Sequence, residues 1–140
     1  MNKFGTHSMN ELQGVRAELI VACTETLAFI GSKGFDMSVF DGLRTEAEQR
    51  KNIRRGVSWT MNSMHLPQAD GLSHAVDLVP YIEGRLRWDS ENKSIQKKID
   101  DCFRYIHEGM MESAELHGFV LEWGFALWGK DKPHFQLRGG

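Results

Sequence analysis

The stretch at residues 64–82, MHLPQADGLSHAVDLVPYI, decides how the rest of the chain is interpreted. Its second half, from Ala75 to Ile82, is an apolar run typical of a buried strand, except that Asp77 stands inside it. A carboxylate in such a place needs a partner. If the partner is a basic side chain, Asp77 is structural. If it is a metal ion, this stretch is the centre of an active site.

Alternation along a regular strand places Asp77 and His74 on opposite faces, so these two side chains are not expected to share a ligand site. His65, in the loop just upstream, is the nearer candidate to join Asp77. A third ligand is available from the C-terminal region, where His134 opens a predicted strand.

Two histidines and one carboxylate, with a fourth position left to water, have the composition of a catalytic zinc site. Asp131, three residues before His134, is then a candidate general base. Spacing alone also allows surface histidines and an Asp77 paired with an arginine, because 6 histidines and 19 acidic residues supply many chance combinations.

The composition bounds the class of protein. A chain of 140 residues fits one domain, and a net charge of −2 gives no overall attraction to nucleic acid or anionic lipid. The N-terminus lacks the apolar segment of a signal peptide, and no run is long enough to insert into a membrane, so a soluble cytoplasmic product is expected. Cys23 and Cys102 have no C-x-x-C spacing, which favours buried free thiols.

Apolar spacing and capping signals predict three helices, at residues 8–30, 45–56 and 89–117. The first is expected to open with a capping box of Ser8 and Glu11. Five strands are predicted, at residues 37–40, 74–82, 85–88, 119–123 and 134–138, with Glu83-Gly84 as a hairpin turn. Without βαβ alternation, the expected fold class is α+β, with a small, mainly antiparallel sheet packed with helices.

Four motifs, in order along the chain, resemble those of the zinc peptidases that cut peptidoglycan peptides. They are Gly42-Leu43-Arg44-Thr45, Ser63-Met64-His65, Ala75-Val76-Asp77-Leu78, and Glu122-Trp123-Gly124 followed by Trp128 and Asp131-Lys132-Pro133-His134-Phe135. That family includes D-alanyl-D-alanine dipeptidases and carboxypeptidases and the phage L-alanyl-D-glutamate endolysins, and its fold is shared with the hedgehog signalling domain. Leu12-Gln13-Gly14-Val15 and the early helix resemble the endolysin branch, so the resemblance covers nearly the whole chain.

The resemblance implies roles for individual residues. It makes His65, Asp77 and His134 the ligands of one zinc ion, with Ser63 in the first ligand motif. It makes Asp131 the catalytic base and Arg44 the arginine that faces the substrate. A guanidinium suits that position, because its fork can hold a carboxylate or the oxyanion of a tetrahedral intermediate.

The chain departs from the family pattern between the first two ligands. Asp77 follows His65 by twelve positions instead of the usual seven, and Ser73 stands where a glycine is expected. The five extra residues, within Pro67 to Gly71, have turn composition. The longer loop leaves Asp70 and His74 as lower-ranked candidates for contact with metal or substrate.

Three other side chains have two interpretations each. Glu122 either orients a ligand histidine or is a carboxylate at the rim of the site. Trp128 is favoured as core or pocket wall over a specific substrate platform. Gln136 either faces the same side as His134 and bonds to substrate, or faces solvent.

We therefore expect residues 1–140 to form a single zinc peptidase domain, without a separate wall-binding domain, that hydrolyses the L-alanyl-D-glutamate bond of peptidoglycan stem peptides. We also expect the protein to be a monomer. It is expected to pass from the host cytoplasm to the wall through a membrane that a holin has permeabilised. The alternatives are a D-Ala-D-Ala dipeptidase or carboxypeptidase, and a zinc-containing interaction domain without activity, against which Asp131 argues. The basic cluster at residues 50–55 raises a nucleic-acid-binding alternative, which the net acidic remainder disfavours.

Overall fold

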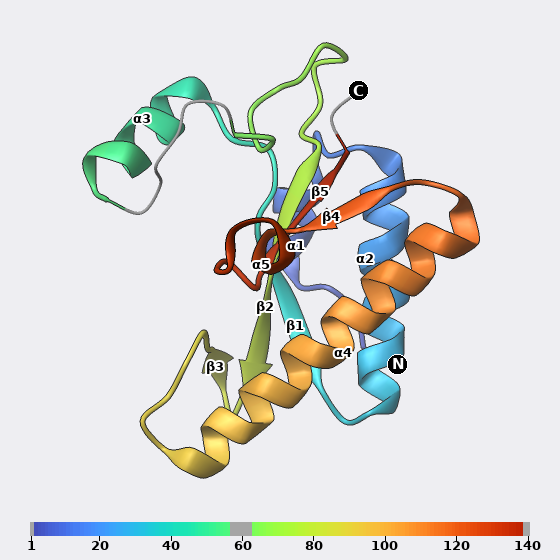
Figure 1. Cartoon of the computed structure of the whole chain (residues 1–140), viewed down its shortest axis with the longest axis vertical. Coiled ribbons are helices and arrows are strands. Elements are labelled where there is room, and N and C mark those ends of the chain that lie inside the picture. The colour runs from blue at the N-terminus through green and yellow to red at the C-terminus, as the bar shows by residue number, and fades with distance from the viewer. Residues whose placement is uncertain (1, 57–62, 139–140) are drawn as a thin grey trace.

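The fold is an antiparallel sheet with two long helices packed together on one face (Figure 1). The computed structural model describes residues 2–56 and 63–138. The helices are α1 (Thr6–Leu12), α2 (Ala17–Ser32), α3 (Glu46–Arg54), α4 (Lys93–His117) and α5 (Gly124–Trp128). The strands are β1 (Asp36–Asp41), β2 (Ala75–Ile82), β3 (Arg85–Leu86), β4 (Leu121–Trp123) and β5 (His134–Leu137).

The sheet has the order β1-β2-β5-β4, with β3 paired to the far end of β2, and every pairing between these strands is antiparallel. This confirms the predicted α+β class with a small antiparallel sheet. β2 lies between β1 and β5, and six of its eight residues are buried.

The core lies between the sheet and the two long helices. Val76, Leu78 and Phe135 project from the sheet into this core and are fully buried against α2 and α4, with Ile30 and Ile106 among their neighbours in the apolar cluster. Because side chains alternate along a strand, burial of Val76 and Leu78 turns the intervening Asp77 to the other face. α3 projects from the body of the fold, on the side away from α4 (Figure 1).

The single first helix predicted at residues 8–30 is wrong: the chain forms two helices, α1 and α2, with a break between them. Gly14, in the break, has φ +80°, a conformation that an L side chain rarely adopts. The break lets this segment pair with the loop before β2, where the Ser73 N–H donates to the Gly14 carbonyl at 2.8 Å and the Arg16 N–H to the Ser73 carbonyl at 3.0 Å. Main-chain pairing therefore overrides helical continuity.

The predicted capping box at Ser8 is also wrong. The helix begins one turn earlier, after Gly5, and Ser8 is buried inside α1. Its hydroxyl oxygen accepts the Val39 N–H at 3.0 Å, which ties α1 to β1. A buried hydrogen-bond acceptor and an N-cap have the same residue preference, so the sequence pattern did not separate them.

Other boundary signals are confirmed. Thr45 and Glu48 form the capping box that opens α3. The turn at Glu83 and Gly84 has φ +49° and +87°, as a two-residue hairpin turn requires, and Gly118 ends α4 in the left-handed region. α4 begins at Lys93, after an Asn92 cap, and not at residue 89. α5 was not predicted, because five residues are too few for a periodic signal.

In the part of the chain that the structure describes, no helix has both the length and the apolar character needed to cross a membrane.

Candidate metal centre

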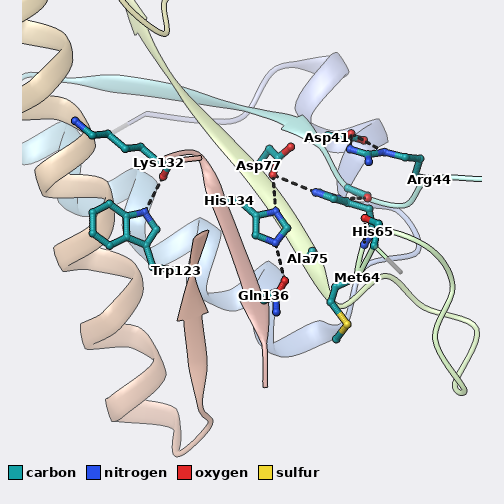
Figure 2. Close-up of polar contacts among 12 residues, drawn as sticks. Asp41, Arg44, Met64, His65, Ala75, Asp77, Trp123, Lys132, His134 and Gln136 are labelled. Carbon is teal, nitrogen blue, oxygen red and sulfur yellow. Dashed lines mark hydrogen bonds and ion pairs between the residues drawn. The ribbon is translucent and has the colours of Figure 1, made fainter. Parts of the chain in front are cut away.

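Three potential metal ligands converge at the middle of the sheet (Figure 2). Asp77 on β2 and His134 on β5 are direct neighbours in the antiparallel register, and His65 comes from the loop before β2. One nitrogen or oxygen from each of the three lies within 4.8 Å of the others. Asp77 Oδ1 is 3.1 Å from His65 Nε2 and 3.0 Å from His134 Nδ1. The structure thus brings together the three residues singled out as ligands.

Each histidine is held at its other ring nitrogen by an acceptor. His65 Nδ1 lies 2.8 Å from the Gly42 carbonyl oxygen, and His134 Nε2 lies 2.8 Å from Gln136 Oε1. A carbonyl oxygen can only accept, so in the neutral rings these nitrogens carry the proton. The lone pairs of His65 Nε2 and His134 Nδ1 are then left facing Asp77, as metal coordination requires.

The orientation of the Gln136 amide is fixed in turn by Glu122. These two residues are opposed in the β4–β5 register, and Gln136 Nε2 donates to Glu122 Oε1 at 3.3 Å. A carboxylate accepts only, so it selects the amide orientation that offers Oε1 to His134. Glu122 thus reaches His134 only through Gln136, and the contact of Gln136 with His134 was not predicted. A hydrogen bond from Gln136 to substrate stays a prediction.

The electrostatics of the group favour an ionised carboxylate. Burial acts to raise the pKa of Asp77, but His65 and His134 outweigh it and hold that pKa well below its ordinary value. Burial acts to lower the pKa of His134, and the hydrogen bond and charge of Asp77 outweigh it, so the pKa is raised. The ionised carboxylate of Asp77 therefore lies between the two imidazoles.

Asp131 lies in a cavity of about 320 Å³ that Asp77 also lines, together with Phe40 and Trp88. Burial, and then the Asp77 charge, raise the pKa of Asp131. Its backbone has φ +72°, a left-handed conformation that costs a non-glycine residue energy, and its carbonyl accepts the His134 N–H at 3.2 Å. The tight turn between Asp131 and His134 therefore holds the candidate base close to a candidate ligand.

Gly124, at the start of α5, explains part of the Glu122-Trp123-Gly124 motif. A Cβ at this position would lie 2.7 Å from the Asp131 carbonyl oxygen and 3.0 Å from His134 Cβ. The Trp123 indole N–H donates to the Lys132 carbonyl at 2.8 Å. The motif thus packs β4 and α5 against the turn that carries Asp131.

Arg44 is almost fully buried beside the group. Its guanidinium donates to the Asp41 carboxylate, with Nε 3.0 Å from Oδ2, and to the Gln49 side-chain oxygen. The backbone N–H of Arg44 donates to the His65 carbonyl at 2.9 Å, and the side chain lines a cavity that Asp77 also lines. No sequence pattern had pointed to Asp41 and Gln49 as its partners.

Asp70 and His74 form a separate polar cluster with Arg16. Asp70 Oδ2 lies 2.9 Å from His74 Nε2 and 3.0 Å from Arg16 Nη1. Strand alternation predicted that His74 would point away from Asp77, and the structure agrees. Neither residue is in the metal-ligand group found among residues 2–56 and 63–138.

Several neighbours fix the backbone of the site. Ser63 Oγ accepts the His65 N–H at 3.1 Å. Ser73, which stands where the family has glycine, is fully buried, and its hydroxyl lies 2.9 Å from the Ala75 carbonyl and 3.3 Å from that of Gly42. The Trp128 ring centroid is 5.1 Å from that of His134, in keeping with a pocket wall.

The donor set fits a zinc ion. It has two imidazoles whose distal nitrogens are hydrogen-bonded to acceptors and one carboxylate whose pKa is low. Such a set holds zinc with an open position for water, which is the arrangement of catalytic sites.

Comparison with known proteins agrees with this geometry. Residues 1–136 match the family model of the phage L-alanyl-D-glutamate peptidase. The crystal structure of the Serratia marcescens L-Ala D-Glu endopeptidase ChiX superimposes with a TM-score of 0.72 at 31% identity, over 96% of this chain and 88% of that one.

Two curated proteins are also similar. The L-alanyl-D-glutamate peptidase of Escherichia phage T5 is 30% identical over 87 residues, which are 62% of this chain and 60% of that enzyme. The ribosomal protein uS12 methylthiotransferase RimO of Parasynechococcus marenigrum is 24% identical over 137 residues, 90% of this chain but 30% of that protein. The chain thus matches under two thirds of the length of either protein. Since the family model extends over nearly the whole sequence, the chain belongs to the phage L-alanyl-D-glutamate peptidase family.

Proposed function

We propose that this protein is a zinc-dependent peptidoglycan endopeptidase that hydrolyses the L-alanyl-D-glutamate bond of wall stem peptides. Family membership supports the reaction class and the substrate. The observation that carries the proposal is the placement of Asp131 in a cavity that reaches Asp77 of the His65, Asp77 and His134 group. A base and a metal site that open into one cavity are what hydrolysis of a peptide bond requires.

In this proposal His65 Nε2, Asp77 and His134 Nδ1 hold the zinc ion. When bound, zinc supplies Lewis acidity that lowers the pKa of a water molecule and polarises the peptide carbonyl. Gln136 and the Gly42 carbonyl keep the two imidazoles in the required tautomer. Glu122 acts through Gln136 as a positioning residue.

Asp131 carries the proton. Its carboxylate accepts a proton from the attacking water and then donates it to the amine of the departing D-glutamyl residue. Phe40 and Trp88, in edge-to-face contact at 5.0 Å, line the cavity in which this transfer takes place.

Arg44 stabilises the negative charge that develops on the carbonyl oxygen or on a substrate carboxylate. A guanidinium has five N–H donors, and the contacts with Asp41 and Gln49 use three of them. Two remain for substrate. The buried pairing with Asp41 holds the guanidinium in place before substrate arrives, which is the requirement for electrostatic stabilisation without reorganisation.

We also propose that residues 1–140 act as a single monomeric domain, made in the host cytoplasm and released to the wall with the help of a holin. Analytical ultracentrifugation of the purified protein tests the monomeric state. Lysis of cells that express the protein with and without a membrane-permeabilising partner tests the release route.

Digestion of purified Gram-negative peptidoglycan, followed by mass spectrometry of the released fragments, tests the scissile bond. The proposal predicts new N-termini at D-glutamate. Release of D-alanine instead would assign the protein to the dipeptidase or carboxypeptidase reaction, and intact peptidoglycan in the presence of zinc-loaded protein would favour a non-catalytic domain.

A further inference from the structure

A second cavity opens from the candidate metal centre toward α3. It has a volume of about 510 Å³ and is lined by Arg44, Asp77 and Phe40, and by residues of α3. Phe40 and Asp77 also line the cavity that holds Asp131. The two cavities therefore meet at the metal group, and a peptide that crosses this group would extend into both.

Most charges around the α3 cavity already have partners within the fold. Arg44 is paired with Asp41. Glu11 accepts the Gly42 N–H at 3.2 Å, and Glu48 accepts the Thr45 N–H of the capping box at 3.3 Å. Asp77 belongs to the metal group.

Lys51 and Arg55 are different. Both side chains line the cavity and both are exposed. They are four positions apart, which places them on the same side of α3 and its C-terminal end. Within residues 2–56 and 63–138, neither side chain has an ion pair or a hydrogen bond. The N–H donors of these two cations are therefore available to an anionic group that enters the cavity.

The substrate of the proposed reaction carries such a group beside the bond that is cut. A glutamyl residue in a peptide is joined through one of its two carboxyl groups and keeps the other one free. Asp41 and Gln49 use three of the five N–H donors of Arg44, whereas the side chains of Lys51 and Arg55 have no hydrogen-bond or ion-pair partner in the part of the chain that the structure describes. A guanidinium and an ammonium together suit carboxylate oxygens.

We propose that Lys51 and Arg55 form an anion subsite that binds the free carboxylates of the stem peptide on the D-glutamyl side of the scissile bond. This inference rests on the proposed endopeptidase function. It assigns to the exposed face of α3 a role in substrate specificity, in place of general attraction to an anionic wall.

The same helix offers a matched control. Arg50 and Arg54 are also basic and also four positions apart, but they do not line the cavity, and Arg50 faces Glu46 at 3.8 Å. The double variants Lys51→Ala/Arg55→Ala and Arg50→Ala/Arg54→Ala remove the same charge from the same helix. Both are assayed as zinc-loaded full-length protein against two stem peptides, one with free carboxylates beyond the scissile bond and one with these carboxylates converted to amides.

For the free-acid peptide, we expect Lys51→Ala/Arg55→Ala to raise KM by roughly 5- to 10-fold with kcat nearly unchanged, because partly exposed ion pairs bind substrate and transition state alike. Arg50→Ala/Arg54→Ala should change KM by less than about 2-fold. With the amidated peptide, the two variants and the wild type should have similar KM values.

Equal effects of the two double variants would overturn the subsite and leave the endopeptidase function standing, and so would a KM increase that persists with the amidated peptide. If the wild type fails to cut the free-acid peptide, the proposed function is wrong and the subsite falls with it. The wild-type rate therefore separates the two failures.

Discussion

Asp77 owes its importance to its neighbours more than to its position in a strand. Its Oδ1 contacts both imidazoles, each of which is held at its far nitrogen by a carbonyl or amide oxygen. A lone buried aspartate would take up a proton, but here the histidines keep its pKa low. The chemistry of this residue is therefore set by an extended hydrogen-bonded group.

Asp131→Asn tests the base at the level of one atom. The amide cannot accept the proton of the attacking water, so kcat should fall by at least ~100-fold. Zinc content should stay at the wild-type value, because Asp131 is outside the ligand group. Steady-state kinetics on a stem peptide, with metal analysis of the same sample, measure both. A variant that cleaves at the wild-type rate would remove Asp131 from the mechanism.

Gln136→Leu tests the positioning of His134. Loss of the amide leaves His134 Nε2 without its acceptor and Glu122 Oε1 without its donor, and zinc affinity should weaken by roughly 10- to 100-fold. Competition with a chromogenic chelator measures the affinity. Gln96→Leu, which makes the same change near the start of α4, is the control and should bind zinc normally. Unchanged affinity in Gln136→Leu would show that the hydrogen bond does not tune the ligand.

For single residues, the sequence predicted the candidate ligands better than the groups that hydrogen-bond to the site residues. Residue types made His65, Asp77 and His134 candidate ligands, and the family resemblance singled them out, because spacing alone also allowed surface histidines. The Gly42 carbonyl and the Asp41 partner of Arg44 were not identifiable, because a main-chain acceptor has no sequence signature and an acidic residue near an arginine has many possible partners.

Among the elements, α1 and the end of β1 approach each other closely beside the site. A Cβ on Gly42 would lie 1.9 Å from the Glu11 carbonyl oxygen, so the glycine lets the end of β1 pass under α1. The same residue supplies the carbonyl that orients His65. The packing of α1 on β1 therefore fixes part of the metal group.

Gly42→Ala should lower the free energy of unfolding by about 2–3 kcal/mol, because the clash is with backbone and cannot be relieved by rotation of a side chain. Gly5→Ala, whose Cβ would meet nothing within 4 Å, should cost less than about 1 kcal/mol. Urea unfolding followed by circular dichroism compares the two. Similar losses for both variants would refute the close approach.

The lengthened loop before β2 is anchored by Asp70. The hydrogen bond from His74, together with the Leu72 N–H and Arg16, lowers the pKa of Asp70 to about 2. An unfolded aspartate titrates near 3.9, so the stabilisation is complete above about pH 4 and is lost as the pH falls from about 4 to 2. The difference in free energy of unfolding between wild type and Asp70→Asn should therefore shrink over this interval. A difference that is constant from pH 6 to pH 2.5 would contradict the anchor.

Local sequence signals predicted the helices whose ends carry a capping residue, such as α3 with its capping box and α4 with its terminal glycine. They failed where long-range pairing intervenes. The first helix is broken because residues 14–16 pair with Ser73, a contact between segments that are far apart in sequence. Periodicity within one segment carries no information about such a partner.

In the whole molecule, the metal group joins parts of the chain that the sheet brings side by side. β2 and β5 are adjacent in the sheet order although α4 lies between them in sequence, and the loop with His65 closes the group from the side of β1. The predicted α+β class did not specify this order. The family resemblance implied only that the ordered motifs meet at one metal ion, and it did not give the strand order either.

The proposed function depends on one zinc ion bound by this group. The most direct test is to titrate metal-depleted protein with zinc and to measure the rate of stem-peptide cleavage at each step. We predict negligible cleavage without metal and a linear return of activity that saturates at about one zinc per chain. Full activity of the metal-depleted protein, or no activity at one bound zinc, would contradict the account.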